Sequence, residues 1–329
     1  MQQRPLGATG REVSAISLGT WQFSTDWGVV DDEDAFAVMD ASVARGVTLF
    51  DTADVYGDGR SESLIKRYLA AHPGRQVTVA TKMGRRVEQV ADNYTPANFR
   101  AWLDRSRANL GVETIDLVQL HCPPSVVIDD PATYDALEAL VADGVIAAYG
   151  VSVETCDQAL AAIYHGVTNI QIIINAFRLK PLEAVLPAAQ AAGVAVFARV
   201  PLASGLLSGR YTASTTFPES DHRTYNRHGE AFDRGETFSG VDYETGLKAA
   251  AELAAALPQG VSLPSAALAW VASRPGVTAA IPGARNVAQA AANADAAALL
   301  DGGFDLDGFD AAVRDVYDRL LRADVHPQW

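Results

Sequence analysis

Short apolar runs alternate with amphipathic segments along most of the 329-residue chain. The apolar runs have the length and β-branched composition of buried strands, and the amphipathic segments have helical periodicity. Eight such strand-helix units in a chain of this length predict a parallel sheet closed into a (β/α)8 TIM barrel. The expected strands cover residues 16–18, 47–50, 77–81, 115–120, 145–150, 169–174, 194–199 and 278–281. The first expected helix begins after the acidic residues 31–34 and runs to about residue 45. The other expected helices cover residues 61–71, 96–109, 131–142, 155–164, 183–192, 243–256, 263–273 and 286–297.

The two ends of the chain add elements to this barrel. Residues 4–14 have the glycine-bearing turns of an N-terminal β-hairpin, and residues 309–321 have the spacing of a C-terminal capping helix. Because no low-complexity linker divides the sequence, we expect one barrel domain over residues 1–329. One connection, residues 210–241, is long and polar, which is typical of a functional or a disordered loop. A solvated surface loop is the alternative.

Charge and cysteine content exclude several classes of function. The formal net charge of −14 argues against nonspecific binding to nucleic acid or to an anionic membrane. The two cysteines are too few for a disulfide framework, and the metal-binding patterns Cys-x-x-Cys and His-Glu-x-x-His are absent, so no metal is expected. Without a signal-peptide pattern or an apolar run of about 20 residues, a cytoplasmic location is expected. The sequence does not indicate an oligomeric state.

Reactive side chains follow three successive strands. The loop after the strand at 47–50 carries Asp51 and Tyr56, the next strand ends at Lys82, and the third ends at His121. Loops at the carboxyl ends of barrel strands are where the chemistry of such proteins usually takes place. Each residue also has a structural interpretation, since Asp51 could cap a helix, Lys82 could be a surface residue and His121 a strand-end residue.

The lysine gives the tyrosine a chemical role. A phenol has an unperturbed pKa of about 10, so a tyrosine donates a proton near neutral pH only with assistance. Lys82 is one of only four lysines, and an ammonium that follows strand residues needs an anionic partner. A cation beside Tyr56 favours the phenolate and makes the phenol a better acid.

This constellation resembles the catalytic tetrad of the aldo-keto reductases, and the resemblance extends from Leu6 to about Asn293. The resemblance implies that Tyr56 is the general acid, that Lys82 lowers its pKa and that Asp51 pairs with Lys82. His121 would orient and polarise the substrate carbonyl. It further implies carbonyl reduction with NADPH, possibly NADH, because no side chain supplies hydride.

The cofactor site is also implied by the resemblance. No Gly-x-Gly-x-x-Gly follows a strand, which fits a family that binds an extended dinucleotide across the barrel mouth. Ser152 and Gln171 would hold the carboxamide, and the segment 201–209 would cover the pyrophosphate. Residues 281–286, with Gln289 and Asn293, would bind the adenosine phosphate. The cofactor-binding residues expected in this way are Gly19, Thr20, Trp21, Asp51, Ser152, Gln171, Arg199, Pro201, Leu202, Ser204, Gly205, Leu207, Gly209, Ile281, Gly283, Arg285, Gln289 and Asn293.

Several residues depart from the family pattern. Val153 replaces an asparagine, and Ile174 replaces a tyrosine that often precedes Asn175. Arg199 stands where many relatives have the aromatic residue that stacks on the nicotinamide. Its planar guanidinium could cover that ring, or it could bind a phosphate or an acidic substrate.

The substrate would be a small carbonyl compound whose identity the sequence does not give. The expected substrate-binding residues are Trp21, Phe23, Tyr56 and His121, with Trp102 and the 210–241 segment as further candidates. Two alternatives remain open. One is a cofactor-binding regulatory or redox-sensing protein with slow turnover. The other is an unrelated barrel isomerase or aldolase that uses Lys82 as a Schiff-base nucleophile.

Overall fold

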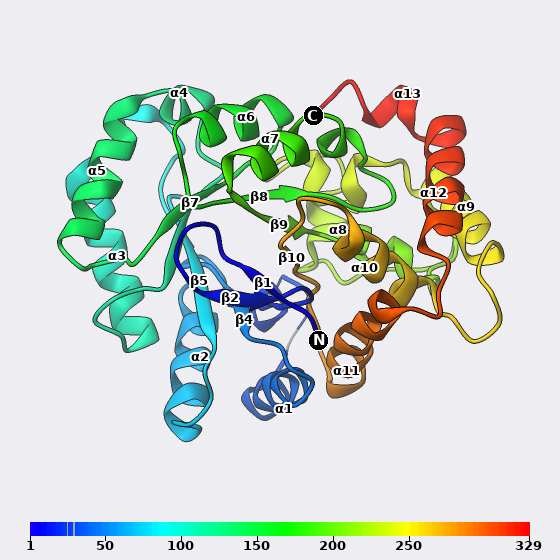
Figure 1. Ribbon diagram of the computed structural model, residues 1–329, viewed down its shortest axis with the longest axis horizontal. Coiled ribbons are helices and arrows are strands. Elements are labelled where there is room, and N and C mark those ends of the chain that lie inside the picture. Colours follow the sequence, from blue (N-terminus) through cyan, green and yellow to red (C-terminus); the bar gives the residue numbers. More distant parts are fainter. Residues whose placement is uncertain (25, 29) are drawn as a thin grey trace.

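Eight parallel strands form a single sheet in the computed structural model, which describes residues 1–24, 26–28 and 30–329 (Figure 1). Each strand pairs with the next one along the chain. The strands are β3 (Leu18–Gly19), β4 (Leu49–Asp51), β5 (Thr78–Met83), β6 (Leu117–His121), β7 (Tyr149–Ser152), β8 (Asn169–Ile173), β9 (Ala195–Arg199) and β10 (Ala279–Ala280).

The sheet closes on itself. Ile16 forms a parallel bridge with Ala280, and Gly19 forms one with Gly283. The Ser17 amide also donates to the Ala280 oxygen at 2.9 Å. The first and last strands are therefore neighbours, and the expected (β/α)8 barrel is confirmed.

Helices surround the barrel and follow the expected ranges to within a few residues. The longer helices are α1 (Asp32–Val43), α2 (Arg60–Ala71), α3 (Pro96–Leu110), α5 (Pro131–Ala142), α6 (Cys156–Tyr164), α7 (Val185–Ala192), α9 (Tyr243–Ala255), α10 (Leu263–Ser273), α11 (Val287–Asp295) and α12 (Leu306–Leu320). Short elements not expected from the sequence are α4 (Ser125–Ile128), α8 (His222–Tyr225), α13 (Arg322–Val325) and the 3-10 helices η1 (Trp21–Phe23), η2 (Ala91–Asn93), η3 (Lys180–Leu182), η4 (Ala203–Ser208), η5 (Arg234–Glu236), η6 (Phe238–Gly240) and η7 (Ala296–Asp301). No helix in the described part of the chain is both long and apolar enough to cross a membrane.

Local sequence determines where these helices begin and end. The Asp31 side chain accepts from the Asp34 amide at 2.8 Å at the start of α1, and acidic residues fill the first turn of that helix. Helix α3 begins with a Thr95 cap followed by Pro96, and it ends at Gly111 in left-handed conformation. The acidic start of α1 was part of the prediction, and the Thr95 cap and Gly111 explain why α3 ends within a residue of its expected range.

Strand β7 is the element whose position differs most from the prediction. The apolar run suggested residues 145–150, but the strand covers Tyr149–Ser152. Ile146 pairs with Ile115 only as an isolated bridge, and the regular ladder begins where Tyr149 pairs with Val118. The start of the run is therefore a buried approach to the sheet, and hydrophobicity alone does not distinguish it from the strand.

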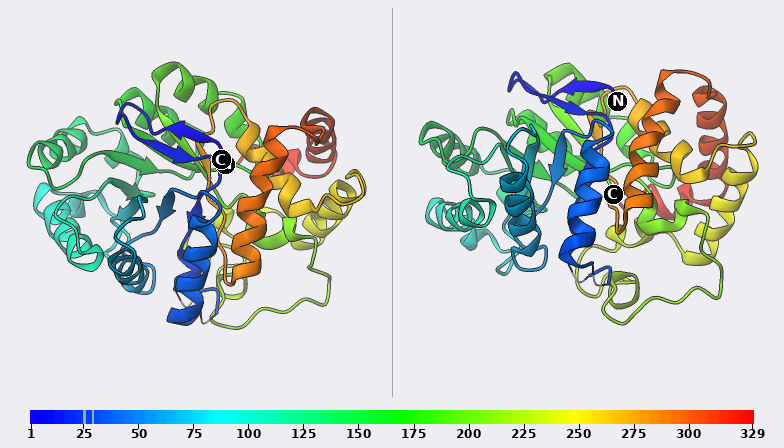
Figure 2. Two further views of the ribbon diagram at one scale, coloured as in Figure 1. Left: turned by 60° about the horizontal axis from the view of Figure 1, so that its bottom comes forward. Right: turned by 90° about the horizontal axis from the view of Figure 1, so that it is seen from below.

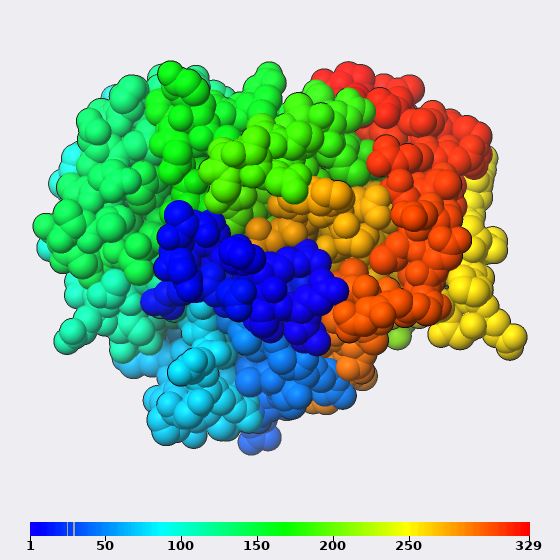
Figure 3. Space-filling model, viewed as in Figure 1, coloured from blue at the N-terminus to red at the C-terminus, as the bar shows by residue number. Residues whose placement is uncertain are grey.

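The N-terminal hairpin closes one end of the barrel. Strands β1 (Gln3–Pro5) and β2 (Glu12–Ser14) pair antiparallel, as expected. Leu6 and Val13 are fully buried against apolar side chains near the amino ends of the barrel strands, such as Leu49. The atoms of this segment, blue in Figure 3, cover the middle of that face. The opposite end of the barrel remains available for a site.

Segments far apart in sequence complete the outer layer. Helices α1 and α11 lie side by side, as both views in Figure 2 show. The C-terminal helix α12 packs against α9 and α10. The 210–241 segment contains α8, η5 and η6, and its residues His222, Arg223 and Glu236 are buried. Residues 221–227 and 232–241 are therefore mostly packed against the molecule, whereas most of residues 210–220 and 228–231 are exposed.

Candidate active site

Neighbouring strands bring the four expected reactive side chains to the open end of the barrel. Asp51 ends β4, Lys82 lies near the end of β5, and His121 ends β6. Tyr56 lies in the loop between β4 and α2. The Lys82 Nζ atom lies 2.5 Å from Asp51 Oδ1 and 3.4 Å from the Tyr56 hydroxyl oxygen. It also donates to the Thr52 carbonyl at 2.8 Å.

Lys82 is a buried cation, with only 1% of its surface exposed. Burial lowers the pKa of the Lys82 ammonium, but the Asp51 carboxylate and the Tyr56 phenol outweigh burial and raise that pKa overall. The lysine therefore carries a proton at neutral pH.

The Tyr56 phenol is also protonated at neutral pH. Burial raises the pKa of Tyr56, Lys82 lowers it, and Asp51 raises it, with a net upward shift. The expectation that Lys82 lowers this pKa describes one interaction correctly, but burial outweighs it. The site thus holds a proton on the phenol, next to a cation that stabilises the phenolate once the proton has left.

His121 lies beside the phenol as a neutral imidazole. Its ring centroid is 6.1 Å from that of Tyr56, and the two rings are nearly perpendicular. Burial holds the pKa of His121 well below its usual range, and Arg85, Lys82 and Arg199 lower it further. Its Nδ1 atom has no hydrogen-bond partner among the described residues. A neutral ring carries one N–H that can donate to a carbonyl oxygen.

A chain of amides holds Asp51 from its other side. The Gln171 Nε2 atom donates to Asp51 Oδ2 at 2.8 Å and to Gln119 Oε1 at 3.0 Å. Gln119 in turn donates to Asn169 Oδ1 at 2.8 Å. Gln171 was expected to hold a cofactor carboxamide, and in the structure its amide nitrogen fixes the carboxylate that pairs with Lys82.

Asp51, Tyr56, His121 and Gln171 line a cavity of ≈ 640 Å³ at the barrel mouth. Its volume is within the range of ligand pockets, about 300–1,000 Å³. Most of the residues expected from the sequence line it. These are Gly19, Thr20, Trp21, Asp51, Tyr56, His121, Ser152, Gln171, Arg199, Pro201, Leu202, Ser204, Gly205, Ile281, Gly283, Arg285, Gln289 and Asn293.

Four expected lining residues lie elsewhere. Phe23 is fully buried in the core, because the tight turn of η1 directs Trp21 toward the cavity and Phe23 away from it. Leu207 is likewise a core residue, and Gly209 ends η4 outside the cavity lining. Trp102 lies on α3 and packs against Tyr94.

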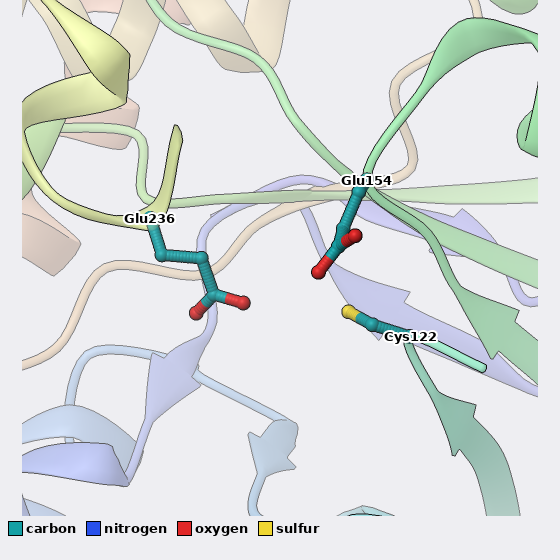
Figure 4. Close-up of side chains that lie close together, drawn as sticks. All are labelled: Cys122, Glu154 and Glu236. Carbon is teal, nitrogen blue, oxygen red and sulfur yellow. The ribbon is translucent and has the colours of Figure 1, made fainter. Parts of the chain in front are cut away.

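Sequence reasoning missed a group of charged residues beside His121. The side chains of Cys122, Glu154 and Glu236 point toward one another (Figure 4). The Cys122 sulfur and one carboxylate oxygen of each glutamate lie within 4.8 Å of one another. Arg85 lies 2.9 Å from Glu236 and 3.3 Å from Glu154. The positive charge that balances the two carboxylates here is therefore that of arginine.

Arg199 completes this cluster. Its Nη1 atom lies 3.5 Å from Glu236, and its Nη2 atom donates to the Val153 carbonyl at 3.0 Å. Burial lowers the pKa of Arg199, but Glu236 and Cys122 outweigh burial, so the guanidinium stays charged. The residue that replaces the usual aromatic is thus fixed between β7 and the 210–241 segment while it lines the cavity.

Aromatic side chains form the wall next to Tyr56. Trp21 stacks nearly parallel to Tyr56, with ring centroids 6.0 Å apart. The His222 ring lies 4.8 Å from Trp21 and 4.3 Å from Trp27. Burial lowers the pKa of His222 to about 4, so this imidazole is neutral and extends the apolar wall.

The far end of the cavity is polar. Asn286 caps α11 by accepting from the Gln289 amide at 3.0 Å. Gln289 Oε1 accepts from the Arg285 amide at 2.8 Å, and Asn293 donates to the Gly283 carbonyl at 3.1 Å. The exposed Arg285 side chain lies close to Gly28 across the cleft.

Some of the residues that the prediction missed could have been found from the sequence, and others could not. Arg85 and Glu154 follow the ends of β5 and β7, where the barrel rule already expects functional groups. His222 and Glu236 lie in the 210–241 segment, which the sequence did indicate as a candidate for the substrate pocket, although Glu236 was not singled out within it. Trp27 has no comparable signal, because it lies in a connection without periodicity.

Comparison with known proteins gives a consistent result. The sequence profile described as "Aldo/keto reductase family" matches residues 15–301. The chain is 31% identical over 299 residues to the aldo-keto reductase YhdN of Bacillus subtilis, covering 88% of this chain and 86% of that protein. The glycerol dehydrogenase AKR11B4 of Gluconobacter oxydans superposes with a TM-score of 0.77 at 30% identity, covering 97% of this chain and 96% of that one. An aldo-keto reductase of Klebsiella pneumoniae solved in complex with NADPH has a TM-score of 0.69 at 22% identity over 96% of each chain, which shows a shared fold.

Proposed function

The chain belongs to the aldo/keto reductase family of oxidoreductases, and from this premise we propose that it reduces a carbonyl compound to an alcohol with NADPH. The substrate would be a small aldehyde, ketone or sugar. The observation that carries the proposal is that a protonated phenol, a buried ammonium and a neutral imidazole meet at one cavity.

The chain's own residues perform the proton transfer and the orientation. Tyr56 holds the proton that the carbonyl oxygen receives, and the Lys82 ammonium stabilises the phenolate that remains. Asp51 keeps Lys82 charged and in place. The His121 N–H positions the carbonyl oxygen beside Tyr56. The reduced nicotinamide, when bound, supplies the hydride.

The cavity fits a dinucleotide. Amide and hydroxyl groups of Ser152 and Gln171 line one end, and the polar side chains of Arg285, Gln289 and Asn293 line the other. Gln22 Oε1 is buried without a hydrogen-bond partner in the described structure, so the lining offers an unsatisfied acceptor. Arg199 would face the nicotinamide end. NADPH complexes of structural neighbours support the same cofactor here.

A direct test is the fall in absorbance near 340 nm with NADPH and then NADH against aldehydes, ketones, aldoses and keto-sugars. The similarity to a glycerol dehydrogenase makes glyceraldehyde and dihydroxyacetone the first compounds to try. Tyr56→Phe should lower the rate by about 10²–10⁴-fold, because it removes the general acid, while NADPH binding persists. Turnover that survives this substitution would contradict the assignment of Tyr56.

Other outcomes of this assay separate the alternatives. NADPH binding without turnover of any carbonyl would favour the regulatory or redox-sensing function. Absence of nicotinamide binding would contradict the proposed function. A Schiff-base role for Lys82 requires a neutral amine, which the raised pKa of Lys82 opposes. Borohydride trapping of a carbonyl on the wild-type protein would reinstate that role.

Cofactor preference gives a second prediction. Arg285 is the cationic side chain expected at the adenosine end, where a 2′-phosphate would distinguish NADPH from NADH. Arg285→Ala should therefore raise the KM for NADPH more than the KM for NADH. Equal changes in the two KM values would show that Arg285 does not bind the 2′-phosphate.

A further inference from the structure

Glu236 reaches the active site from the 210–241 segment, and Trp329 packs against the other side of that segment. We propose that Glu236 is a positioning residue for Arg199, and that Trp329 clamps residues 233–240 so that Glu236 stays in place. The effect on cofactor binding rests on the proposed function, whereas the clamping of residues 233–240 by Trp329 does not depend on it.

Glu236 is built into the site as a charged bridge. Its carboxylate lies 2.9 Å from Arg85 and 3.5 Å from Arg199, and the residue is buried. Burial raises the pKa of Glu236, but the two arginines outweigh burial and lower it overall. The carboxylate is therefore ionised. It fixes the plane of the Arg199 guanidinium, which would otherwise be anchored by the Val153 carbonyl and a long contact with Cys122.

The backbone on both sides of Glu236 is tied to the barrel rim. The Ser204 hydroxyl donates to the Glu236 carbonyl at 2.9 Å and accepts from the Phe238 amide at 3.0 Å. Asn175, which follows β8, donates to the Ser239 hydroxyl at 2.7 Å. The segment thus lies against Ser204, which lines the cavity, and against Asn175 beyond the end of β8.

The local conformation of this segment is not one that its residues favour. Phe238, Ser239 and Gly240 have consecutive φ values of 52°, 60° and 75°. Side chains other than glycine rarely adopt this left-handed region because Cβ approaches the following carbonyl. Contacts from outside the segment must therefore hold it.

Trp329 supplies those contacts on the outer side. Its indole lies 3.7 Å from the Arg178 guanidinium carbon, and its Nε1 atom donates to Asp233 Oδ1 at 3.0 Å. Only 7% of the tryptophan is exposed. A Cβ atom on Gly240 would lie 2.2 Å from the ring, and one on Gly235 would lie 2.2 Å from Arg178 Nη2. Two glycines thus allow the segment to pack directly against the Arg178–Trp329 pair.

Removal of the clamp should act through Glu236. Loss of one hydrogen bond or ion pair to a charged group corresponds to roughly tenfold in affinity. We expect Glu236→Gln and Trp329→Ala each to weaken NADPH binding by roughly that factor and to change kcat less. The double variant should be no weaker than Glu236→Gln alone, because both changes remove the same contact.

Isothermal titration calorimetry with NADPH on the full chain measures these constants. Trp102→Ala is the matched control, since it removes a partly buried tryptophan that is remote from the cavity. Trp329→Phe keeps a ring on Arg178 but loses the bond to Asp233, and it should recover part of the affinity. Unchanged affinity in both Glu236→Gln and Trp329→Ala, or additive losses in the double variant, would overturn the inference.

A cofactor-independent measurement separates this inference from the proposed function. The Cys122 thiol is buried against Glu236 and Arg199. In a Cys156→Ala background, Trp329→Ala should speed the reaction of Cys122 with a thiol reagent, whereas Trp102→Ala should not. Failure of the wild type to bind NADPH would contradict the function alone, and an unchanged labelling rate would contradict the clamp.

Discussion

At the scale of single residues, Asp54 is a carboxyl group whose ionisation is opposed by its surroundings. It lies two positions before Tyr56, is 1% exposed, and neither carboxylate oxygen has a hydrogen-bond partner among the described residues. Burial and the neighbouring Glu62 raise the pKa of Asp54 to about 7, against the opposing effect of Arg86 and Arg105. The folded protein therefore binds this proton more tightly than the unfolded chain, whose aspartate pKa is about 3.9.

This shift predicts a pH dependence of stability. The proton on Asp54 stabilises the folded state, because the pKa of Asp54 is higher there than in the unfolded chain. This stabilisation is fully present below about pH 4 and is lost as the pH rises to about 7, by up to about 4 kcal/mol. Asp54→Asn removes the titrating carboxyl group and should therefore avoid this loss. The variant's free energy of unfolding in urea, measured relative to that of the wild type, should grow between pH 5 and 8. Asp92→Asn, at an exposed position without an ion pair among the described residues, is the control. An advantage of equal size at pH 5 and 8 would contradict the prediction.

At the scale of elements, the N-terminal hairpin and the reactive loops occupy opposite ends of the barrel. Val13 is fully buried under the strands, so Val13→Ala should destabilise the protein by roughly 2 kcal/mol while leaving NADPH affinity unchanged. Val126, which is 60% exposed, gives the matched control in Val126→Ala. Urea unfolding with calorimetry tests both statements. A change in NADPH affinity in Val13→Ala would show that the hairpin is coupled to the site.

Elements also explain how far the sequence leads. Asp51, Lys82 and His121 were predicted to meet because parallel strands share one end, whatever the details of packing. Phe23 and Leu207 were misplaced because the direction of a side chain in a short 3-10 turn depends on tertiary contacts and not on periodicity. The start of β7 was misplaced for a related reason, since a buried approach and a buried strand have the same composition.

At the scale of the whole molecule, the features that the sequence could not reveal are contacts between distant segments. Glu236 meets Arg85 across 151 positions of sequence. Trp329 meets Asp233 across 96. Such pairs carry no local pattern, whereas eight repeated strand-helix units do. The barrel and the meeting of Asp51, Tyr56, Lys82 and His121 at one end of it were therefore predictable, and the charged cluster with its proposed clamp required the structure.

The closure of the barrel at its hairpin end also determines the route by which the catalyst resets. Under the proposed mechanism, Tyr56 becomes a phenolate after each cycle and must regain a proton. Leu6 and Val13 seal the amino ends of the strands with apolar side chains, and the amides of Gln171, Gln119 and Asn169 that extend from Asp51 toward that end carry no ionisable proton. Under this mechanism the replacement proton therefore reaches Tyr56 through the same mouth that admits the reactants. A molecule bound in that mouth would slow the reprotonation of the phenolate.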